Sequence, residues 1–411
     1  MMSLPSRYST ALSFGAALVA AAALGPQHAA AQAKPEIVIG AIVPSSGPFA
    51  EWGRTNTVAL KMLEKQVNDA GGVNGGKLRI VILDDAARPA QATNSLRKLA
   101  GDEKVLAVAG PLTSSAAEVT FPVANQMAVV STSQASSKPG VAKANRPWAF
   151  RNTIDEGILA KTTVPYFKKA FDIKTVAVIY DAKDATAATV GQRIMPAVLK
   201  ENGITVVNEN DLLSFNTGDL DVSAQVTKMK SLNPDGVMLS ADYSQGVTVL
   251  REMKRQGLIK PVVGATQLIS SAILKAAPEI AIVSPATFYA TMKGARVEKF
   301  VAELQPLLRR ESGLPPEIEP SMYDANIYEI VSMYIDAVKK TGVTGKPEDL
   351  EADRKKIRDH MEKLQGFEGL GGPIGFNPDG DAIKAFYIVQ GQNGAWETKV
   401  RGCSSAGGGG C

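Results

Sequence analysis

From residue 36 onwards, short apolar runs alternate with segments whose apolar residues recur every three or four positions. The stretch 36–44, EIVIGAIVP, is rich in Ile and Val and ends at a proline, which is typical of a buried strand. The segment 57–72 then places Met62, Leu63 and Val67 on one helical face and ends at two glycines. The pattern therefore predicts a strand followed by a helix.

The same alternation continues in two series along the chain. The first series predicts strands at 77–85, 105–110 and 128–132, with helices at 90–102 and at 114–127, the latter interrupted near Pro122. The second predicts strands at 175–181, 205–211, 237–242 and 260–266, with helices at 188–203, 219–236 and 246–257. Repeated strand–helix units predict parallel sheets with helices on both faces, and here they occur twice. The expected fold class is α/β, with two Rossmann-like lobes.

Later segments are expected to return to each lobe. After a strand-like stretch at 283–291 come further helices, including 323–342, and then a turn-rich stretch and a strand within 372–390. The boundary between the lobes is expected near Phe150–Arg151. The expected division is 1–33 as signal peptide, 34–151 plus 285–370 as the N-terminal lobe, 152–284 plus 371–400 as the C-terminal lobe, and 401–411 as a flexible tail.

The N-terminus has the features of a secretory signal peptide. Arg7 precedes the apolar run ALSFGAALVAAAALG, and small residues offer cleavage sites near Ala31 or Ala33. The run is too short to span a bilayer comfortably, which disfavours a membrane anchor. We expect an exported, periplasmic protein.

Composition excludes several classes of function. The net charge of +4 is small and scattered, so nothing suggests a nucleic-acid partner. Histidine occurs only at His28, in the signal peptide, and at His360, in a charged segment expected to be a solvated helix. The segment 71–78, GGVNGGKL, lacks the Ser or Thr of a phosphate loop and follows a helix rather than a strand. We expect no catalytic triad, no metal site, no cofactor and no enzyme activity.

The two cysteines, Cys403 and Cys411, bracket a Gly/Ser-rich stretch at the C-terminus. In an oxidising compartment they could close a small loop, although such a composition favours a flexible tail without a role in folding.

Three hydroxyls follow the predicted strand at 105–110, at Thr113, Ser114 and Ser115. Ligands of parallel α/β sheets gather at the carboxyl ends of the strands, where the next helix begins. A helix start offers free N–H groups and a partial positive charge, which suits a carboxylate. Hydroxyls there either bind that anion or cap the helix, and spacing alone favours neither interpretation.

Two further segments lie at comparable strand ends. Ser131, Thr132, Ser133 and Gln134 follow the next strand, again at a carboxyl edge. After the first strand, the loop PSSGPFAEWG ends near Trp52, whose ring is a candidate lid over a small ligand or a packing residue beneath the loop.

The order of these motifs resembles the Leu/Ile/Val-binding type of periplasmic receptor, which serves ABC importers of the branched-chain amino acid type. The resemblance runs from VIGAIVPSSGPFAEWG through GPLTSSAAEV and STSQASS to GFNPDGD. It implies the type I periplasmic binding fold, with two lobes joined by three crossovers that close on one solute.

By position, the resemblance also implies roles for individual residues. Ser114 matches the residue that holds the ligand carboxylate, Gln134 and Ala135 match a second carboxylate- or ammonium-binding turn, and Trp52 matches an aromatic cover. From the second lobe, Ala185, Asp242 and Thr266 fall where such receptors contact the ammonium group and side chain. Amino-acid receptors usually have an acid at the position of Thr266 and often an aromatic at that of Ala185.

We therefore expect a solute receptor that delivers a carboxylate-bearing ligand to an inner-membrane ABC permease and acts as a monomer. Branched-chain or other amino acids are the favoured ligands. Thr266 and Ala185 make aromatic or aliphatic carboxylic acids an alternative class of ligand. Amides, urea-like solutes or short peptides are a further alternative. A ligand-sensing domain of a signalling system and a secreted hydrolase are the rival classes.

Overall fold

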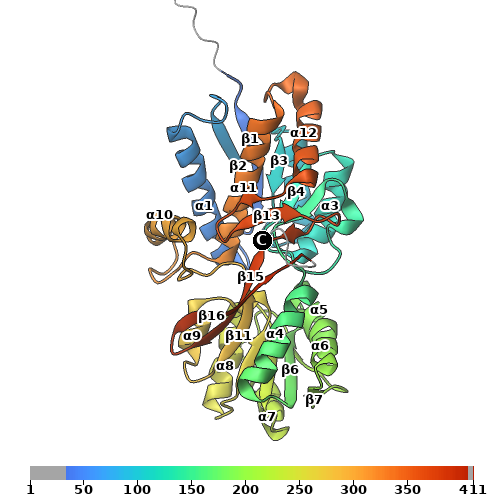
Figure 1. Cartoon of the computed structure of the whole chain (residues 1–411), viewed down its shortest axis with the longest axis vertical. Helices are drawn as coiled ribbons and strands as arrows, with labels where there is room; N and C mark the ends of the chain where they lie inside the picture. Colours follow the sequence, from blue (N-terminus) through green and yellow to red (C-terminus); the bar gives the residue numbers. More distant parts are fainter. Residues whose placement is uncertain (1–33, 406–410) are drawn as a thin grey trace, which may run out of the picture. The chain divides into compact units, whose positions relative to one another are not determined.

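The computed structural model describes residues 34–405 and residue 411, and Pro35–Cys411 form one compact unit. This unit contains two α/β lobes, each built on its own mainly parallel sheet (Figure 1). The strand–helix alternation predicted from the sequence is confirmed in both.

The first sheet has the strand order β2-β1-β3-β4-β5, and all of its pairs are parallel. Its strands are β1 (Ile37–Val43), β2 (Leu78–Asp84), β3 (Ala107–Ala109), β4 (Val130–Ser133) and β5 (Ala149–Arg151). Every residue of β3, β4 and β5 is buried, because helices cover both faces of a parallel sheet. The carboxyl ends of β1, β3 and β4 therefore meet at one edge.

The second sheet has the order β16-β15-β11-β10-β9-β6-β7, with β8 also paired to β6. Its strands are β6 (Thr175–Asp181), β7 (Thr205–Val206), β8 (Leu213–Phe215), β9 (Gly236–Ser240), β10 (Val262–Gly264), β11 (Ile282–Ala286), β15 (Ala385–Gln392) and β16 (Ala395–Cys403). The strands β6 to β11 are parallel, whereas β15 and β16 join as an antiparallel pair. A small third sheet contains β12 (Phe367–Glu368), β13 (Pro373–Phe376) and β14 (Ala382–Ile383).

The helices connect these strands. In the first half of the chain they are α1 (Ala50–Asp69), α2 (Pro89–Gly101), α3 (Ser114–Gln126), α4 (Glu156–Phe171), α5 (Ala185–Thr189), the π-helical turn η2 (Val190–Ile194) and α6 (Met195–Glu201). In the second half they are α7 (Ser223–Ser231), α8 (Tyr243–Arg255), α9 (Ser271–Ala276), α10 (Ala295–Glu311), α11 (Met322–Thr341) and α12 (Leu350–Lys363). Short 3₁₀ turns lie at η1 (Lys143–Asn145), η3 (Thr266–Leu268) and η4 (Pro347–Asp349).

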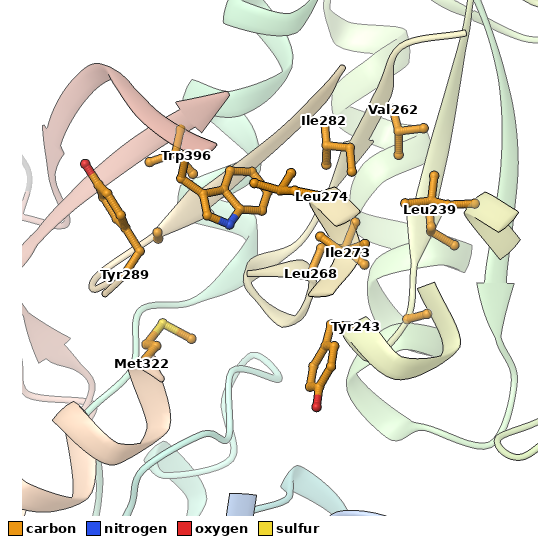
Figure 2. Packing of buried hydrophobic residues seen from close by; sticks show 14 of the residues in the cluster. Leu239, Tyr243, Val262, Leu268, Ile273, Leu274, Ile282, Tyr289, Met322 and Trp396 are labelled. Carbon is orange, nitrogen blue, oxygen red and sulfur yellow. The ribbon is translucent and has the colours of Figure 1, made fainter. Parts of the chain in front are cut away.

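Each lobe has a hydrophobic core, and the cluster that contains the second sheet also includes first-lobe residues such as Val58 and Met62. In the first, Ile39 of β1 packs in one cluster with α11 residues such as Ile330 and Tyr334. In the second, Leu239, Val262 and Ile282 come from three neighbouring strands and pack against residues that follow β10 (Figure 2). Burial of these side chains supplies the main favourable term in folding.

The chain passes between the two sheets three times, after β5, after β11 and between β14 and β15. Arg151, the last residue of β5, is buried at the first crossover. It pairs with Asp155 nearby and with Asp381, which directly precedes β14 near the third crossover. Ile374 and Phe376 of β13 belong to the core cluster of the first sheet. We therefore propose a lobe division in which the last return to the second lobe occurs at β15, rather than at residue 371 as expected from the sequence.

The local structure differs from the sequence predictions at two places and agrees with them at a third. The helix α3 continues through Pro122 instead of being interrupted there. The expected strand at 205–211 is only the two-residue β7, since the following residues form turns. The segment 71–78 forms a turn with a bridge between Val73 and Gly76, as predicted.

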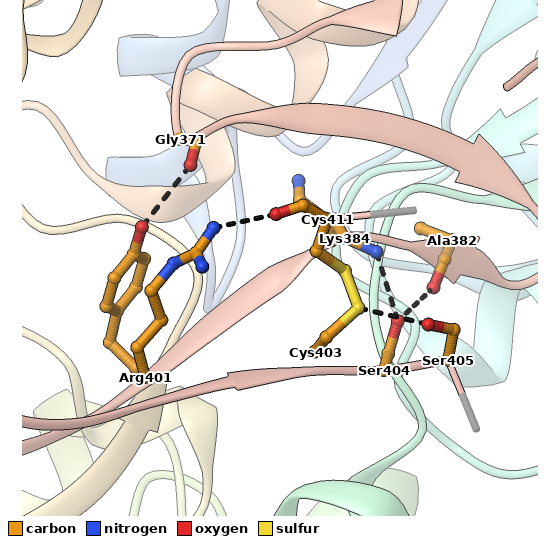
Figure 3. Close-up of a disulfide and its surroundings, with 9 residues drawn as sticks. Gly371, Ala382, Lys384, Arg401, Cys403, Ser404, Ser405 and Cys411 are labelled. Atoms are coloured by element: carbon orange, nitrogen blue, oxygen red, sulfur yellow. Dashed lines mark hydrogen bonds between the residues drawn. A yellow bond between two sulfur atoms is a disulfide. The ribbon is translucent and has the colours of Figure 1, made fainter. Parts of the chain in front are cut away.

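The C-terminal region differs from the expected flexible tail over its first residues. β16 extends to Cys403 and pairs with β15 from Ala395 to Cys403, apart from one irregularity in register at Ile388 and Val389, so the strand continues up to the Gly/Ser-rich residues. Cys403 and Cys411 form a disulfide, and Arg401 donates a 2.8 Å hydrogen bond to the Cys411 carbonyl (Figure 3). The Ser404 hydroxyl accepts from the Lys384 amide at 3.0 Å, which anchors this end of the chain beside the third crossover. The predicted signal peptide, residues 1–33, lies outside the described residues.

Candidate ligand-binding site

Two hydroxyls from different lobes meet at the start of α3. The Oγ of Ser114, the first residue of α3, lies 2.8 Å from the Oγ1 of Thr186, which belongs to α5 in the second lobe. The Ser136 hydroxyl donates to Ser114 Oγ at 3.0 Å. All three side chains are buried. A cluster of hydroxyls at a helix N-terminus suits an anionic group, as the sequence suggested.

The neighbouring hydroxyls have structural partners. Thr113 is the N-cap of α3, and its Oγ1 accepts from the Ala116 amide at 3.2 Å. Ser115 Oγ lies 3.3 Å from Thr113 Oγ1. Of the two interpretations left open for this trio, capping therefore applies to Thr113, and only Ser114 reaches the opposite lobe.

The turn after β4 carries the next three predicted residues. Ser133 Oγ accepts from the Ser136 amide at 3.0 Å and holds the turn that includes Ala135. The side-chain Nε2 of Gln134 donates to Asn56 Oδ1 at 3.4 Å, while Gln134 Oε1 is buried and has no hydrogen-bond partner. This oxygen is available to a donor on a ligand.

Trp52 was predicted to end a flexible loop, but it lies in the first turn of α1, which begins at Ala50. Its ring is stacked on Phe49, with the centroids 5.3 Å apart, and contacts Tyr323 at 4.3 Å and Tyr243 at 5.8 Å. Only 5% of Trp52 is exposed. The tryptophan is thus the centre of an aromatic cluster that involves α1, α8 and α11.

The second-lobe residues lie at the ends of β6, β9 and β10. Asp242 is the N-cap of α8 and accepts from the Ser244 amide at 2.8 Å through Oδ1, while its buried Oδ2 has no partner. Ala185 is the first residue of α5. Thr266 donates its hydroxyl to Glu156, which begins α4.

Three carboxyl groups act electrostatically on Tyr323, and of these Glu156 and Asp242 are buried while Asp184 is half-buried. Burial raises the pKa of Glu156 to about 7 and that of Asp242 to about 7, and it also raises the pKa of Asp184. The same three carboxyls raise the pKa of Tyr323, after burial as the largest cause. Desolvation disfavours an anion, so these acids hold their protons unless a cation is nearby.

The sequence missed several residues of this group. Gln267 follows Thr266 and donates to Asp184 at 3.3 Å, and its Oε1 is buried without a partner. Tyr243 donates to Glu51 across the two lobes. Gln267, Tyr243 and Glu51 each adjoin a predicted residue, so their strand-end position was a usable signal. Glu156 and Tyr323 gave no such signal, because the crossovers bring them in from other parts of the chain.

The described residues also line a pocket of about 340 Å³, which shares Trp52 and Tyr243 with this cluster. Ser114, Gln134, Asp242 and Thr266 are not among its lining residues. The polar residues form the candidate site, because their chemistry and their unpartnered oxygens indicate a ligand, and the pocket adjoins them at Glu51, Trp52 and Tyr243.

Residues 34–405 and 411 contain no group of three or more His, Cys, Asp and Glu side chains arranged to hold a metal ion. His360 is not solvated as expected: its Nε2 lies 3.0 Å from Asp336, and burial lowers its pKa. Over the same residues, no helix has the length and apolarity required to cross a membrane.

Comparison with known proteins places this architecture. The chain is 29% identical over 239 residues to the Leu/Ile/Val-binding protein homolog 3 of Brucella melitensis, an alignment that covers 58% of this chain and 63% of that relative. The chain thus matches somewhat less than two thirds of the relative's length.

Two solved structures share the fold. The branched-chain amino acid transporter substrate binding protein LivJ of Streptococcus pneumoniae, in complex with isoleucine, is 23% identical with a TM-score of 0.76 over 90% of this chain and 99% of that one. A solute binding protein of an ABC transporter from Rhodopseudomonas palustris, in complex with 3,4-dihydroxybenzoic acid, is 21% identical with a TM-score of 0.76 over 90% and 98%.

The two-lobed fold with three crossovers, expected from the sequence, is therefore confirmed. A sequence model of the family described as periplasmic binding protein matches residues 36–395. Because this match spans both sheets and all three crossovers, the chain belongs to the periplasmic binding protein family.

Proposed function

We propose that this protein is the substrate-binding component of an ABC importer and that it binds an amino acid between its two lobes. The observation that supports this proposal most directly is a set of buried, unpartnered acceptors: Gln134 Oε1, Asp242 Oδ2 and Gln267 Oε1. An unsatisfied buried polar atom costs about 1–3 kcal/mol, so these oxygens favour a ligand that donates several hydrogen bonds.

The ammonium group of an amino acid meets this requirement. It carries three donors and a positive charge, and Glu156, Asp184 and Asp242 supply carboxylates around Tyr323. Glu156 accepts a hydrogen bond from the Thr266 hydroxyl, so an acid occupies this neighbourhood even though position 266 itself is a threonine. The departure at Thr266 is thus compensated from α4.

The carboxylate of the ligand is assigned to the start of α3. There the Ser114 and Ser136 hydroxyls combine with the backbone N–H groups of the first helical turn. Thr186 contributes a hydroxyl from the second lobe. Contacts from both lobes to one ligand stabilise the closed state, which is how hinge closure responds to binding.

An aromatic carboxylic acid is the second candidate. The cluster of Trp52, Tyr243 and Tyr323 offers ring surfaces, and the Rhodopseudomonas palustris protein of the same fold was crystallised with 3,4-dihydroxybenzoic acid. Such a ligand has no ammonium group and leaves the three carboxyl groups uncompensated, which makes it the weaker choice.

Membership of the family supports a proposal for the physiological setting. We propose export through the predicted signal peptide, action in the periplasm as a monomer, and delivery of the ligand to an inner-membrane permease. Binding by hydroxyls and amides requires no cofactor, and no chemical step is assigned to the site.

The pH dependence of binding tests the proposal. Asp242 and Glu156, each with a pKa of about 7, must lose their protons to pair with an ammonium group. Amino-acid affinity, measured by isothermal titration calorimetry, is expected to rise at least about tenfold between about pH 5 and about pH 8. Affinity for 3,4-dihydroxybenzoate is expected to stay level or fall. The reverse pattern would favour the aromatic-acid function.

Ser114→Ala is expected to weaken amino-acid binding about tenfold, because one charge-assisted hydrogen bond contributes about 1.5–3 kcal/mol. The neighbouring Ser115→Ala is the matched control, since the side-chain hydrogen bond that Ser115 makes in the described structure is with Thr113, two residues away. Its affinity is expected to equal that of the wild type, and thermal stability to change little in either variant. Equal affinity of both variants would contradict the assignment of Ser114.

A further inference from the structure

The end of β16 lies directly beside the third crossover. Cys403, its last residue, pairs with Ala385, the first residue of β15. The Ser404 hydroxyl accepts from the Lys384 amide at 3.0 Å and donates to the Ala382 carbonyl at 3.0 Å (Figure 3). The Ser404 amide donates to the Lys384 carbonyl at 3.2 Å. The residue after β16 therefore holds the backbone of the third crossover.

A covalent bond fixes this end of the chain. Cys403 forms a disulfide with Cys411, and Arg401 of β16 donates to the Cys411 carbonyl at 2.8 Å. Residues near the end of a chain lose order unless they are tied down. Ser404 lies beyond the last pair of the β15–β16 ladder, so the disulfide restrains it where the ladder has already ended.

The surroundings of the disulfide favour its cleavage by a thiol. Cys403 and Cys411 are both half-buried, so a reagent has access to them. The Ser405 hydroxyl lies 3.1 Å from Cys403 Sγ, and the Arg401 guanidinium is held at Cys411. A hydrogen-bond donor and a positive charge stabilise a thiolate, and a more stable thiolate leaves faster. We therefore assign Cys403 as the leaving thiolate.

The third crossover is connected to the interior through Lys384. Its Nζ lies 2.9 Å from Glu329 Oε2 on α11 and donates to Asn152 Oδ1, beside the first crossover, at 3.3 Å. The other carboxylate oxygen of Glu329 accepts from the Leu370 amide at 2.8 Å. A displacement of Lys384 therefore acts on two crossovers and on α11 at once.

We propose that the Cys403–Cys411 disulfide is a thiol–disulfide exchange site for a dithiol reductant, and that its redox state controls the freedom of the third crossover. In the oxidised protein the disulfide keeps Ser404 bound to the crossover. In the reduced protein Ser404 leaves, and the backbone around Lys384 is released. The inference concerns neither the cleft nor the ligand, so it does not rest on the proposed function.

The exchange proceeds in two steps. One thiolate of the reductant attacks Cys411 Sγ, which forms a mixed disulfide and breaks the bond to Cys403; the Cys403 thiolate then takes up a proton. The second thiol of the reductant loses its proton and attacks the reductant sulfur of the mixed disulfide, so that Cys411 leaves as a thiolate and is protonated. Two electrons and two protons thus pass to the cysteines, and the reductant becomes a disulfide.

Reduction of the folded protein by dithiothreitol tests the exchange site. Two thiols are expected to form while circular dichroism shows the protein folded, counted by mass spectrometry after alkylation. Ser405→Ala is expected to be reduced at least about threefold more slowly, because the leaving thiolate loses its donor. The matched control, Ser231→Ala, removes an exposed hydroxyl at the end of α7 and should react like the wild type. Reduction only after unfolding in urea, or equal rates for the two variants, would overturn the exchange site.

Amide hydrogen exchange of the ligand-free protein, measured by NMR, tests the control of the crossover. Protection of the Lys384 amide is expected to fall at least about tenfold after reduction and in Cys403→Ser/Cys411→Ser. Ser404→Ala keeps the disulfide but removes the acceptor, so it should lose the same protection in the oxidised protein. The Leu370 amide should also exchange faster after reduction, whereas the Val263 amide in the buried strand β10 should not change.

Two results of the exchange experiment contradict the inference. One is equal protection of the Lys384 amide in the oxidised and reduced protein. The other is a loss of protection at Lys384 with Leu370 unchanged, because the release would then stop at the end of the chain. Both experiments are made without ligand, so their failure is distinct from a failure of the proposed amino-acid binding.

Discussion

Asp242→Asn is expected to reduce amino-acid affinity about 100-fold while making the ligand-free protein more stable at pH 8. The loss follows from removing the carboxylate whose unpartnered Oδ2 is assigned to the ligand ammonium. A charged hydrogen bond contributes about 1.5–3 kcal/mol, and the remaining acids keep part of the attraction. Asparagine is also a good N-cap, so α8 should still begin at the same place.

The gain in stability follows from the pKa of about 7 for Asp242 in the folded protein. In the unfolded chain an aspartate has a pKa of about 3.9, so the folded protein binds this proton more tightly. Stability from Asp242 therefore falls as pH rises from about 4 to about 7, and asparagine avoids this loss. We expect about 2 kcal/mol more stability at about pH 8 and little difference at about pH 4, measured by urea denaturation.

Asp221→Asn is the matched control for this variant. Asp221 accepts from the Ser223 amide at 2.9 Å, which is the same local contact that Asp242 makes with Ser244, but it is exposed. This hydrogen bond lowers the pKa of Asp221, so its removal should slightly destabilise the protein at neutral pH. Ligand affinity should not change. If Asp242→Asn binds amino acids normally, the ammonium assignment is wrong.

Lys384→Met is expected to lower the free energy of unfolding by about 3–5 kcal/mol, because it leaves Glu329 buried without its cation. Lys384 Nζ lies 2.9 Å from Glu329 Oε2 and also contacts the side chains of Asn326 and Asn152. The side chains of Lys384 and Glu329 are 6% and 4% exposed, so solvent cannot replace the lost partner.

The position of this ion pair explains why its loss should affect more than one lobe. Asn152 follows β5 at the first crossover, and Lys384 precedes β15 at the third, while Glu329 and Asn326 lie on α11. Asn326 also donates to the Gln134 carbonyl at 2.8 Å, which connects the ion pair to the turn of the candidate site.

Chemical denaturation monitored by circular dichroism measures this effect. The control is Lys355→Met, which removes the exposed Lys355–Glu351 pair on α12 and should cost less than about 1 kcal/mol. The double variant Lys384→Met/Glu329→Gln should recover part of the stability, because no buried charge remains unpaired. Equal denaturation midpoints for Lys384→Met and Lys355→Met would show that the buried pair contributes little.

Local pattern was sufficient to predict most of the secondary structure. Ile- and Val-rich runs such as β1 and β6 are long enough, and apolar enough, to identify buried parallel strands without tertiary information. The same pattern failed where pairing decides the structure. β16 alternates weakly and follows a turn, and it is a strand because β15 offers an unsatisfied backbone edge.

The sequence by itself determined the fold class and the strand ends at which candidate residues such as Ser114, Gln134 and Asp242 lie, because strand–helix alternation fixes where ligands gather in a parallel sheet. Only the tertiary structure decided which of these residues meet. Glu156 and Tyr323 reach the site through the crossovers, and the contact of Ser114 with Thr186 depends on packing between the lobes, whereas Thr113 caps its own helix locally. Burial, which raises the pKa of Glu156 and Asp242, arises only when distant segments exclude water together.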